Sequence, residues 1–198
     1  MVWEKGNRGT RGATRVEVLL EGYVREGDTA GMERACATVS LVRDRGLRVV
    51  CDPGTVSRPD ILLQALEKRN LRPVDIQWVF LSHSHLDHCR YAGLFPEAYI
   101  LDYWGAWEGD LCRSGVRRLS DRITAVETPG HSADSLTLMV ASDTGVVAVC
   151  GDVFWDRRID FSDPHAIDPV SLAQSRDLVL TAADFFVPGH GDIVKIDR

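Results

Sequence analysis

Apolar residues along the chain gather into short runs with the length and composition of β-strands. The first runs cover residues 16–24, 37–43 and 47–51 and are rich in Val and Leu. Residues 44–46, with the sequence Asp-Arg-Gly, separate the last two runs and are typical of a tight turn. We therefore expect an antiparallel sheet at the start of the fold.

Two stretches have helical spacing instead. Ser57 precedes Asp60 by three residues, as at a helix N-terminus, and apolar residues then recur at helical steps until Asn70, which ends the predicted helix. Residues 171–182 form the second predicted helix. Further short strands are expected at 77–81, 98–101, 123–127, 136–141, 146–150, 184–187 and 193–196.

The order of these elements predicts one folded unit after a short N-terminal arm. Residues 1–15 are polar, rich in Gly and Arg, and have no apolar period, which predicts a flexible N-terminal arm. No repeat, low-complexity tract or linker divides residues 16–198. We expect a single domain with two β-rich halves, each covered by a helix.

Composition narrows the class of protein. The 198 residues are 44% hydrophobic and 26% charged, which favours a globular domain over a fibrous or disordered chain. The 23 Lys and Arg residues against 29 Asp and Glu residues give a net charge of -6, so no stable DNA partner is expected. Apolar runs are too short to cross a membrane, and the absence of a signal-peptide run predicts a cytoplasmic protein. The five scattered cysteines, an odd number without a C-x-x-C pair, are expected to be reduced thiols.

Candidate chemistry is concentrated in one segment that directly follows an apolar strand. Within six residues the chain carries His83, His85, Asp87 and His88. His83 and His85 are two positions apart, so both would project to the same side of an extended chain. Imidazole and carboxylate groups are ligands that suit Zn²⁺, Mn²⁺ or Fe²⁺. The segment therefore predicts a metal site that can hold one ion and reach a second.

Three further residues of ligand type follow other predicted strands. His131 and His190 each come after a Pro-Gly turn at the end of an apolar run, and Asp152 follows the run at 146–150. A carboxylate at that point can bridge two cations, with one oxygen to each. Seven ligand-type residues at four strand ends indicate a metal centre more strongly than any one of them alone.

Together these residues resemble the metallo-β-lactamase superfamily. The motif His83-x-His85-x-Asp87-His88 is followed in order by His131, Asp152 and His190. The resemblance covers about residues 16–196 and implies an α+β fold, a four-layer αββα sandwich in a minimal single domain. It implies that His83, His85 and His131 hold a first metal, that Asp87, His88 and His190 hold a second, and that Asp152 bridges them.

The resemblance also implies an activity. Two divalent ions, zinc first and manganese or iron as alternatives, would provide a metal-bridging hydroxide at neutral pH. Asp87 and Asp152 would be the catalytic carboxylates, with Asp87 orienting the nucleophile. Asp52, in an early Asp-Pro-Gly motif, would accept the second N–H of a ligand imidazole.

Substrate residues are less marked in the sequence. Aromatic and basic side chains near the motifs are candidates for contacts with a substrate, and core packing or a solvated surface is the alternative for each. His165, the remaining histidine, is also a candidate proton donor. The candidates are Trp104, Trp107, Trp155, Arg117, Arg118 and His165.

Three activities stay open at this point. The first is hydrolysis of a small ester, lactone or thioester, which an acidic, minimal chain permits. The second is a phosphodiesterase or ribonuclease acting on RNA, because short stretches such as residues 18–23 and 151–154 resemble a subgroup of the superfamily linked to RNA cleavage in animals. The third is a persulfide dioxygenase with a single iron. The partner is thus a small molecule or RNA, and the oligomeric state, a homodimer included, is open.

Overall fold

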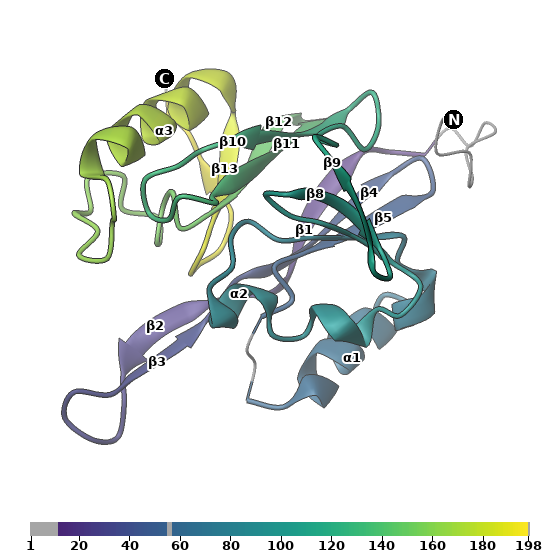
Figure 1. The fold of residues 1–198 in the computed structure, drawn as a ribbon, viewed down its shortest axis with the longest axis horizontal. Helices are drawn as coiled ribbons and strands as arrows, with labels where there is room; N and C mark the ends of the chain where they lie inside the picture. Colours follow the sequence, from purple (N-terminus) through teal and green to yellow (C-terminus); the bar gives the residue numbers. More distant parts are fainter. Residues whose placement is uncertain (1–11, 55–56, 198) are drawn as a thin grey trace.

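The computed structural model describes residues 12–54 and 57–197, which form two facing β-sheets with helices on the outer faces (Figure 1). A seven-stranded sheet has the order β1-β4-β5-β6-β7-β8-β9, a five-stranded sheet has the order β10-β11-β12-β13-β14, and β2 pairs with β3 alone. The strands are β1 (Arg15–Leu20), β2 (Tyr23–Glu26), β3 (Glu33–Cys36), β4 (Val39–Asp44), β5 (Leu47–Cys51), β6 (Trp78–Phe80), β7 (Tyr99–Leu101), β8 (Gly105–Glu108), β9 (Leu111–Ser114), β10 (Ile123–Glu127), β11 (Leu136–Ser142), β12 (Gly145–Gly151), β13 (Phe185–Pro188) and β14 (Val194–Lys195). The helices are α1 (Pro59–Glu67), α2 (Leu86–Cys89) and α3 (Pro169–Ala182), with short 3₁₀ turns η1 (Pro73–Asp75) and η2 (Ala92–Leu94).

Alternation of side chains along the strands builds the four layers. Val49 of β5 packs into the cluster between the two sheets, and the next residue, Val50, packs under α1 with Leu62. Likewise Val149 faces the other sheet, and Cys150 faces α3. Each buried strand therefore serves two apolar layers, as a period of two requires. The αββα sandwich is confirmed.

Strand direction places the functional loops at one edge. β5, β6 and β7 run parallel to one another, and β12 runs parallel to β13. The segments that follow β5, β6, β12 and β13 carry Asp52, His83, Asp152 and His190 in turn. Because the carboxyl ends of parallel strands meet at the same edge of a sheet, these side chains converge there.

Several predicted boundaries are corrected. The run at 16–24 is two strands, β1 and β2, and β2 leaves the sandwich to pair with β3 in a projecting hairpin (Figure 1). The strands β3, β8 and β9 were not predicted. Ser57 does not cap α1, which begins at Pro59 after Arg58, a residue without a side-chain cap hydrogen bond. Asn70 has a φ of 55° just beyond the helix, and α3 begins two residues earlier than predicted, capped by Asp168.

The predicted N-terminal arm is too long at its inner end. Thr14 is buried, and its hydroxyl donates to Asp44 Oδ1 at 2.9 Å. Its backbone N–H donates to the carboxylate of Asp143, and β1 already begins at Arg15. Residues 14 and 15 therefore belong to the folded domain, and residues 1–11 of the predicted arm lie outside the described residues.

Two predictions on the whole chain can be compared with the structure. All five cysteines are free, which confirms the expected thiols. Among the residues that the structure describes, no helix is both long enough and apolar enough to cross a membrane.

Candidate metal centre

The histidine-rich segment bends around the end of β6. His83 and His85 lie in the loop after this strand, and α2, a single helical turn, carries Asp87 and His88. Gly54 lies directly against the backbone of this turn, and a Cβ at this position would overlap the carbonyl oxygen of Asp87. The early Asp-Pro-Gly motif therefore acts partly through its glycine, which lets two backbones approach closely.

The remaining ligand-type residues come from the five-stranded sheet. His131 follows β10, Asp152 follows β12, and His190 follows β13. Gly189 lies directly against Asp152, and a Cβ at this position would overlap Oδ1 of that carboxylate. The glycine before His190 thus leaves the space that Asp152 occupies.

These side chains form two adjoining groups. In each group the ligand atoms lie within 4.8 Å of one another. The first group is His83, His85, His131 and Asp152, and the second is Asp87, His88 and His190. This grouping brings together all seven residues that the sequence analysis selected, in the division that the family resemblance implies.

Asp152 lies between the two groups. Its Oδ2 is 3.3 Å from His131 Nε2 in the first group. Its Oδ1 is 3.2 Å from His88 Nε2 and 3.5 Å from His190 Nε2 in the second. Each oxygen of the carboxylate therefore faces a different group, which is the geometry that a bridging ligand requires.

Hydrogen bonds to Nδ1, the ring nitrogen that faces away from the cluster, fix four of the five histidine rings. His88 Nδ1 lies 3.0 Å from Asp52 Oδ2, and His131 Nδ1 lies 2.6 Å from Asp163 Oδ2. The other two Nδ1 bonds go to neutral groups: His190 donates to the carbonyl of Cys36 at 2.9 Å, and His83 meets Ser82 Oγ at 3.0 Å. With Nδ1 engaged, the Nε2 atom of each ring is directed toward the cluster, as in metal sites generally.

The predicted role of Asp52 agrees with this arrangement. Its φ of 48° turns the residue back toward the loop after β6, where Oδ1 accepts the backbone N–H of Ser82 at 2.7 Å. The sequence analysis did not identify Asp163, Ser82 or the Cys36 carbonyl as partners of the ligands. The fold brings Asp163 and the Cys36 carbonyl to their partners from distant parts of the chain, whereas Ser82 directly precedes His83.

Burial and neighbouring charges shift the pKa values of the ligand residues in different directions. Burial, followed by the nearby imidazole of His88, holds the pKa of His83 well below its usual range. Burial opposes charge on His88 as well, but the carboxylates of Asp152 and Asp52 raise its pKa well above normal. For Asp152, burial is outweighed by His88 and His190, which hold its pKa well below normal.

Unpaired buried atoms show that the cluster suits a cation. Among the described residues, His83 Nε2, His88 Nε2 and Asp152 Oδ1 are buried and have no hydrogen-bond partner. Such atoms are costly unless something binds them. All three point to the ligand cluster, and imidazole and carboxylate donors are those that divalent transition metals prefer.

The aromatic candidates separate into two sets. The ring of Trp155 lies 6.0 Å from His190 and 6.5 Å from His131, and His165 stacks on Trp155 at 5.4 Å. Trp104 follows β7 at the site edge of the sheet and is exposed. Trp107 pairs across strands with Ile100, which packs on the α1 side of the sheet, so the structure does not bring Trp107 to the site.

The arginine candidates are engaged with the protein itself. Arg117 donates to the carbonyl of Tyr103 at 2.6 Å and pairs with Glu127 at 3.4 Å. The side chain of Arg118 pairs with Asp121 at 2.8 Å. Its backbone forms an isolated β-bridge with Thr124, near the end of β10 that lies away from His131. These contacts place Arg118 away from the metal cluster, and they hold Arg117 between Tyr103 and Glu127.

The fold and the cluster together define a metal-dependent hydrolase. Residues 37–111 match the family model of the metallo-beta-lactamase superfamily. The metallo-beta-lactamase domain-containing protein 1 of Xenopus laevis is 34% identical over 194 residues, which cover 91% of this chain and 81% of that protein. The chain belongs to the metallo-β-lactamase superfamily, and its resemblance to this subgroup is confirmed.

Other relatives extend the comparison. An uncharacterised protein of Caenorhabditis elegans is 31% identical over 181 residues, or 82% of this chain, and the match spans 49% of that protein, so the chain corresponds to about half its length. A metallo-β-lactamase structure from Thermotoga maritima superposes with a TM-score of 0.75 at 22% identity, over 93% of this chain and all of that one. An N-acyl homoserine lactone hydrolase superposes with a TM-score of 0.67 at 15% identity, over 90% and 92% of the two chains. These structures establish the likeness of fold.

Proposed function

We propose that the chain hydrolyses a small carboxylic ester, lactone or thioester with two divalent metal ions, of which zinc is the first candidate and manganese or iron the alternatives. The observation that carries the proposal is Asp152, whose two oxygens face two separate groups of nitrogen and oxygen donors. Two ions held there would supply an activated water and polarise the substrate carbonyl. A small-molecule substrate and action in the cytoplasm go with this proposal.

The residues of the chain would divide the remaining work. His83, His85 and His131 would hold one ion and Asp87, His88 and His190 the other, with Asp152 shared. Asp87 Oδ2 lies 3.6 Å from His190 Nε2 and is partly exposed, so this carboxylate can also accept a proton from, and orient, an attacking water. Asp52 and Asp163 would keep His88 and His131 in the tautomer that presents Nε2 to the ion.

Charge favours a small substrate over a polyanion. A nuclease gains much of its affinity from arginine and lysine side chains that meet phosphates. Here Arg117 and Arg118 are paired with Glu127 and Asp121, and the chain carries a net charge of -6. Lactone hydrolysis by a structural neighbour of the same fold agrees with the proposal.

The direct experiment is hydrolysis by the metal-reconstituted protein of a panel of esters, lactones and thioesters, with single-stranded RNA as a separate substrate. The variant Asp152→Ala, prepared in the same way, is the control for contaminating activity. Turnover of a panel member that the variant loses would support the proposal.

Two results would replace it. Cleavage of RNA alone, impaired by charge reversal at Arg117 and Arg118, would assign the chain as a ribonuclease. One iron per chain together with oxygen consumption on a persulfide substrate would assign it as a dioxygenase.

A further inference from the structure

Three aromatic rings form a continuous wall beside the metal cluster. Trp155, Phe161 and His165 all come from the loop between β12 and α3. The ring centroids of Trp155 and Phe161 are 5.5 Å apart, and those of Trp155 and His165 are 5.4 Å apart with the planes nearly parallel, at 12°. We call these three residues the aromatic wall.

The aromatic wall is joined to the ligands of both groups. The ring of Trp155 meets His131 of the first group and His190 of the second edge-on. The carbonyl of Trp155 accepts the backbone N–H of His190 at 2.6 Å. A substrate whose reacting carbon lies at the metals would therefore extend along this wall if it leaves the centre on the α3 side.

The loop that carries the wall is held at two points by one partly buried cation. Arg176 of α3 donates from Nε to the carbonyl of Val153 and from Nη1 to the carbonyl of Phe161, both at 2.8 Å. The ring of Phe154, between these points, is fully buried against α3. At the far side, Asp163 Oδ1 accepts the backbone N–H of His165 at 2.8 Å. The wall is thus pre-organised, which lowers the entropy cost of binding.

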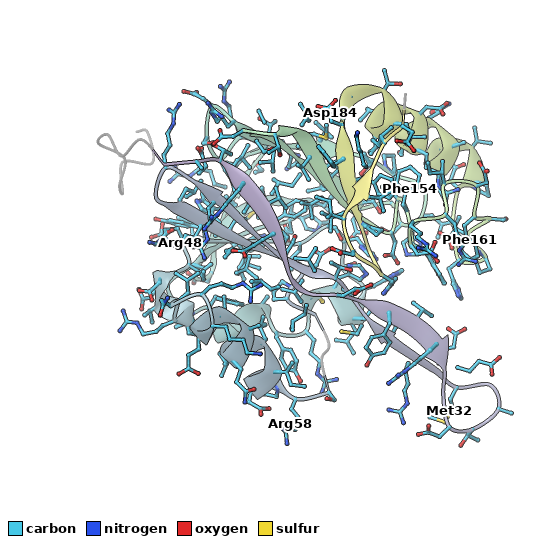
Figure 2. All side chains as sticks on the ribbon, turned by 180° about the vertical axis from the view of Figure 1, so that it is seen from behind. Met32, Arg48, Arg58, Phe154, Phe161 and Asp184 are labelled. Carbon is cyan, nitrogen blue, oxygen red and sulfur yellow. The ribbon has the colours of Figure 1, made fainter. Side chains whose placement is uncertain are left out.

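The three rings of the aromatic wall are not fully buried in the core. His165 is exposed, and Trp155 and Phe161 are partly exposed. In Figure 2, Phe161 lies on the same side of the molecule as the β2–β3 hairpin, whose end carries Met32, and it is set apart from the buried Phe154. The indole Nε1 of Trp155 is buried without a hydrogen-bond partner among the described residues, although buried indoles usually have one.

We propose that the aromatic wall selects substrates that carry an aromatic ring next to the hydrolysed bond. This inference rests on the proposed function. Aromatic rings prefer offset or edge-on contact with other rings and gain more there than their buried area alone provides. A rigid row of three rings beside the reacting centre therefore favours a flat ring over an aliphatic group of equal size.

The experiment compares esters that share one leaving group and differ in the acyl part: phenylacetyl, cyclohexylacetyl and acetyl. We expect kcat/KM for phenylacetyl to exceed that for acetyl by at least about 10-fold, and that for cyclohexylacetyl by about 3- to 10-fold. The double variant Phe161→Leu with His165→Ala should lose the preference over cyclohexylacetyl, measured as the ratio of the two kcat/KM values so that any general change in activity cancels. Leu111→Ala, an exposed apolar residue of β9, is the matched control and should keep the full preference.

Binding of the product acids gives a readout without turnover. Phenylacetate should quench tryptophan fluorescence at a lower concentration than cyclohexylacetate in the native protein, and the double variant should remove the difference. Equal binding and equal turnover of the ring and cyclohexyl compounds would overturn the inference, as would a preference that survives in the double variant. If no ester is hydrolysed but phenylacetate is preferred, the proposed function fails and the aromatic wall stands.

Discussion

The two ligand groups that meet at Asp152 are supported in different ways. In the second group, the buried His88 is tied to the carboxylate of Asp52, and His190 is tied to the backbone carbonyl of Cys36. In the first group, His131 is tied to Asp163, whereas His85 is exposed. Chelate sites with fixed, buried ligands bind more tightly than those with a mobile member. If two ions bind as proposed, we therefore expect the second group to hold its ion more firmly than the first group, which contains the exposed His85.

Removing the carboxylate of Asp152 should have the largest effect, because one of its oxygens faces each of the two groups. We expect Asp152→Ala to weaken the binding of both ions by more than about 100-fold, above the range for an outer ligand partner. Metal content after dialysis, determined by elemental mass spectrometry, is the measurement. Asp60, a partly exposed residue in the first turn of α1, provides a control, since Asp60→Ala should retain the native content. Loss of one ion with retention of the other would show that Asp152 serves a single group.

The second-largest effect should come from distorting α2, the turn that carries Asp87 and His88. The added Cβ in Gly54→Ala overlaps the backbone of Asp87, so α2 must move, at a cost of at least about 3 kcal/mol. Thermal unfolding should shift by roughly 6–12 °C for a domain of this size. A Cβ at Gly93 would meet nothing within 4 Å, and Gly93→Ala should stay within about 0.5 kcal/mol of the native protein. Equal shifts in the two variants would contradict the close approach at Gly54.

Asp163 and Asp52 each contact a ligand histidine from outside the two groups, and replacing them one at a time should distinguish the groups. Asp163→Asn removes the charge beside His131, and Asp52→Asn removes the charge beside His88. Each should weaken one ion by about 10- to 100-fold and leave the other nearly unchanged. A chelator titration that resolves two steps measures this: the weaker step should move in Asp163→Asn and the tighter step in Asp52→Asn. The reverse assignment would invert the proposed difference between the groups.

The smallest effect should come from the neutral partner of His83. Ser82 Oγ lies 3.0 Å from His83 Nδ1, and a neutral hydrogen bond contributes about 1 kcal/mol. Ser82→Ala should therefore weaken the first ion by about fivefold. The same titration would show it, and a loss as large as that of Asp163→Asn would mean that the hydroxyl does more than orient the ring.

The ligands could be predicted from the sequence because they lie in local patterns. His83, His85, Asp87 and His88 occupy six consecutive positions after an apolar strand, and His131 and His190 each follow a Pro-Gly turn. Such patterns can be recognised without knowledge of the fold, since the carboxyl ends of neighbouring parallel strands meet at one edge of a sheet.

Apart from Asp52, the supporting residues could not be predicted in this way. Asp163 is 32 residues from His131 in the chain, and Arg176 reaches the aromatic loop from a helix. The hairpin β2–β3 was also missed, because it is exposed on both faces and so lacks the alternation that marks a half-buried strand. Trp107 shows the opposite error: an aromatic near a motif in sequence lies on the other face of the sheet.

The most direct test of the account is anomalous diffraction from crystals of the metal-loaded protein, recorded on both sides of the metal absorption edge. We predict two peaks, one among His83, His85 and His131 and one among Asp87, His88 and His190, each in contact with a different oxygen of Asp152. A single peak, or two peaks that do not share Asp152, would contradict the proposal of a dinuclear hydrolase.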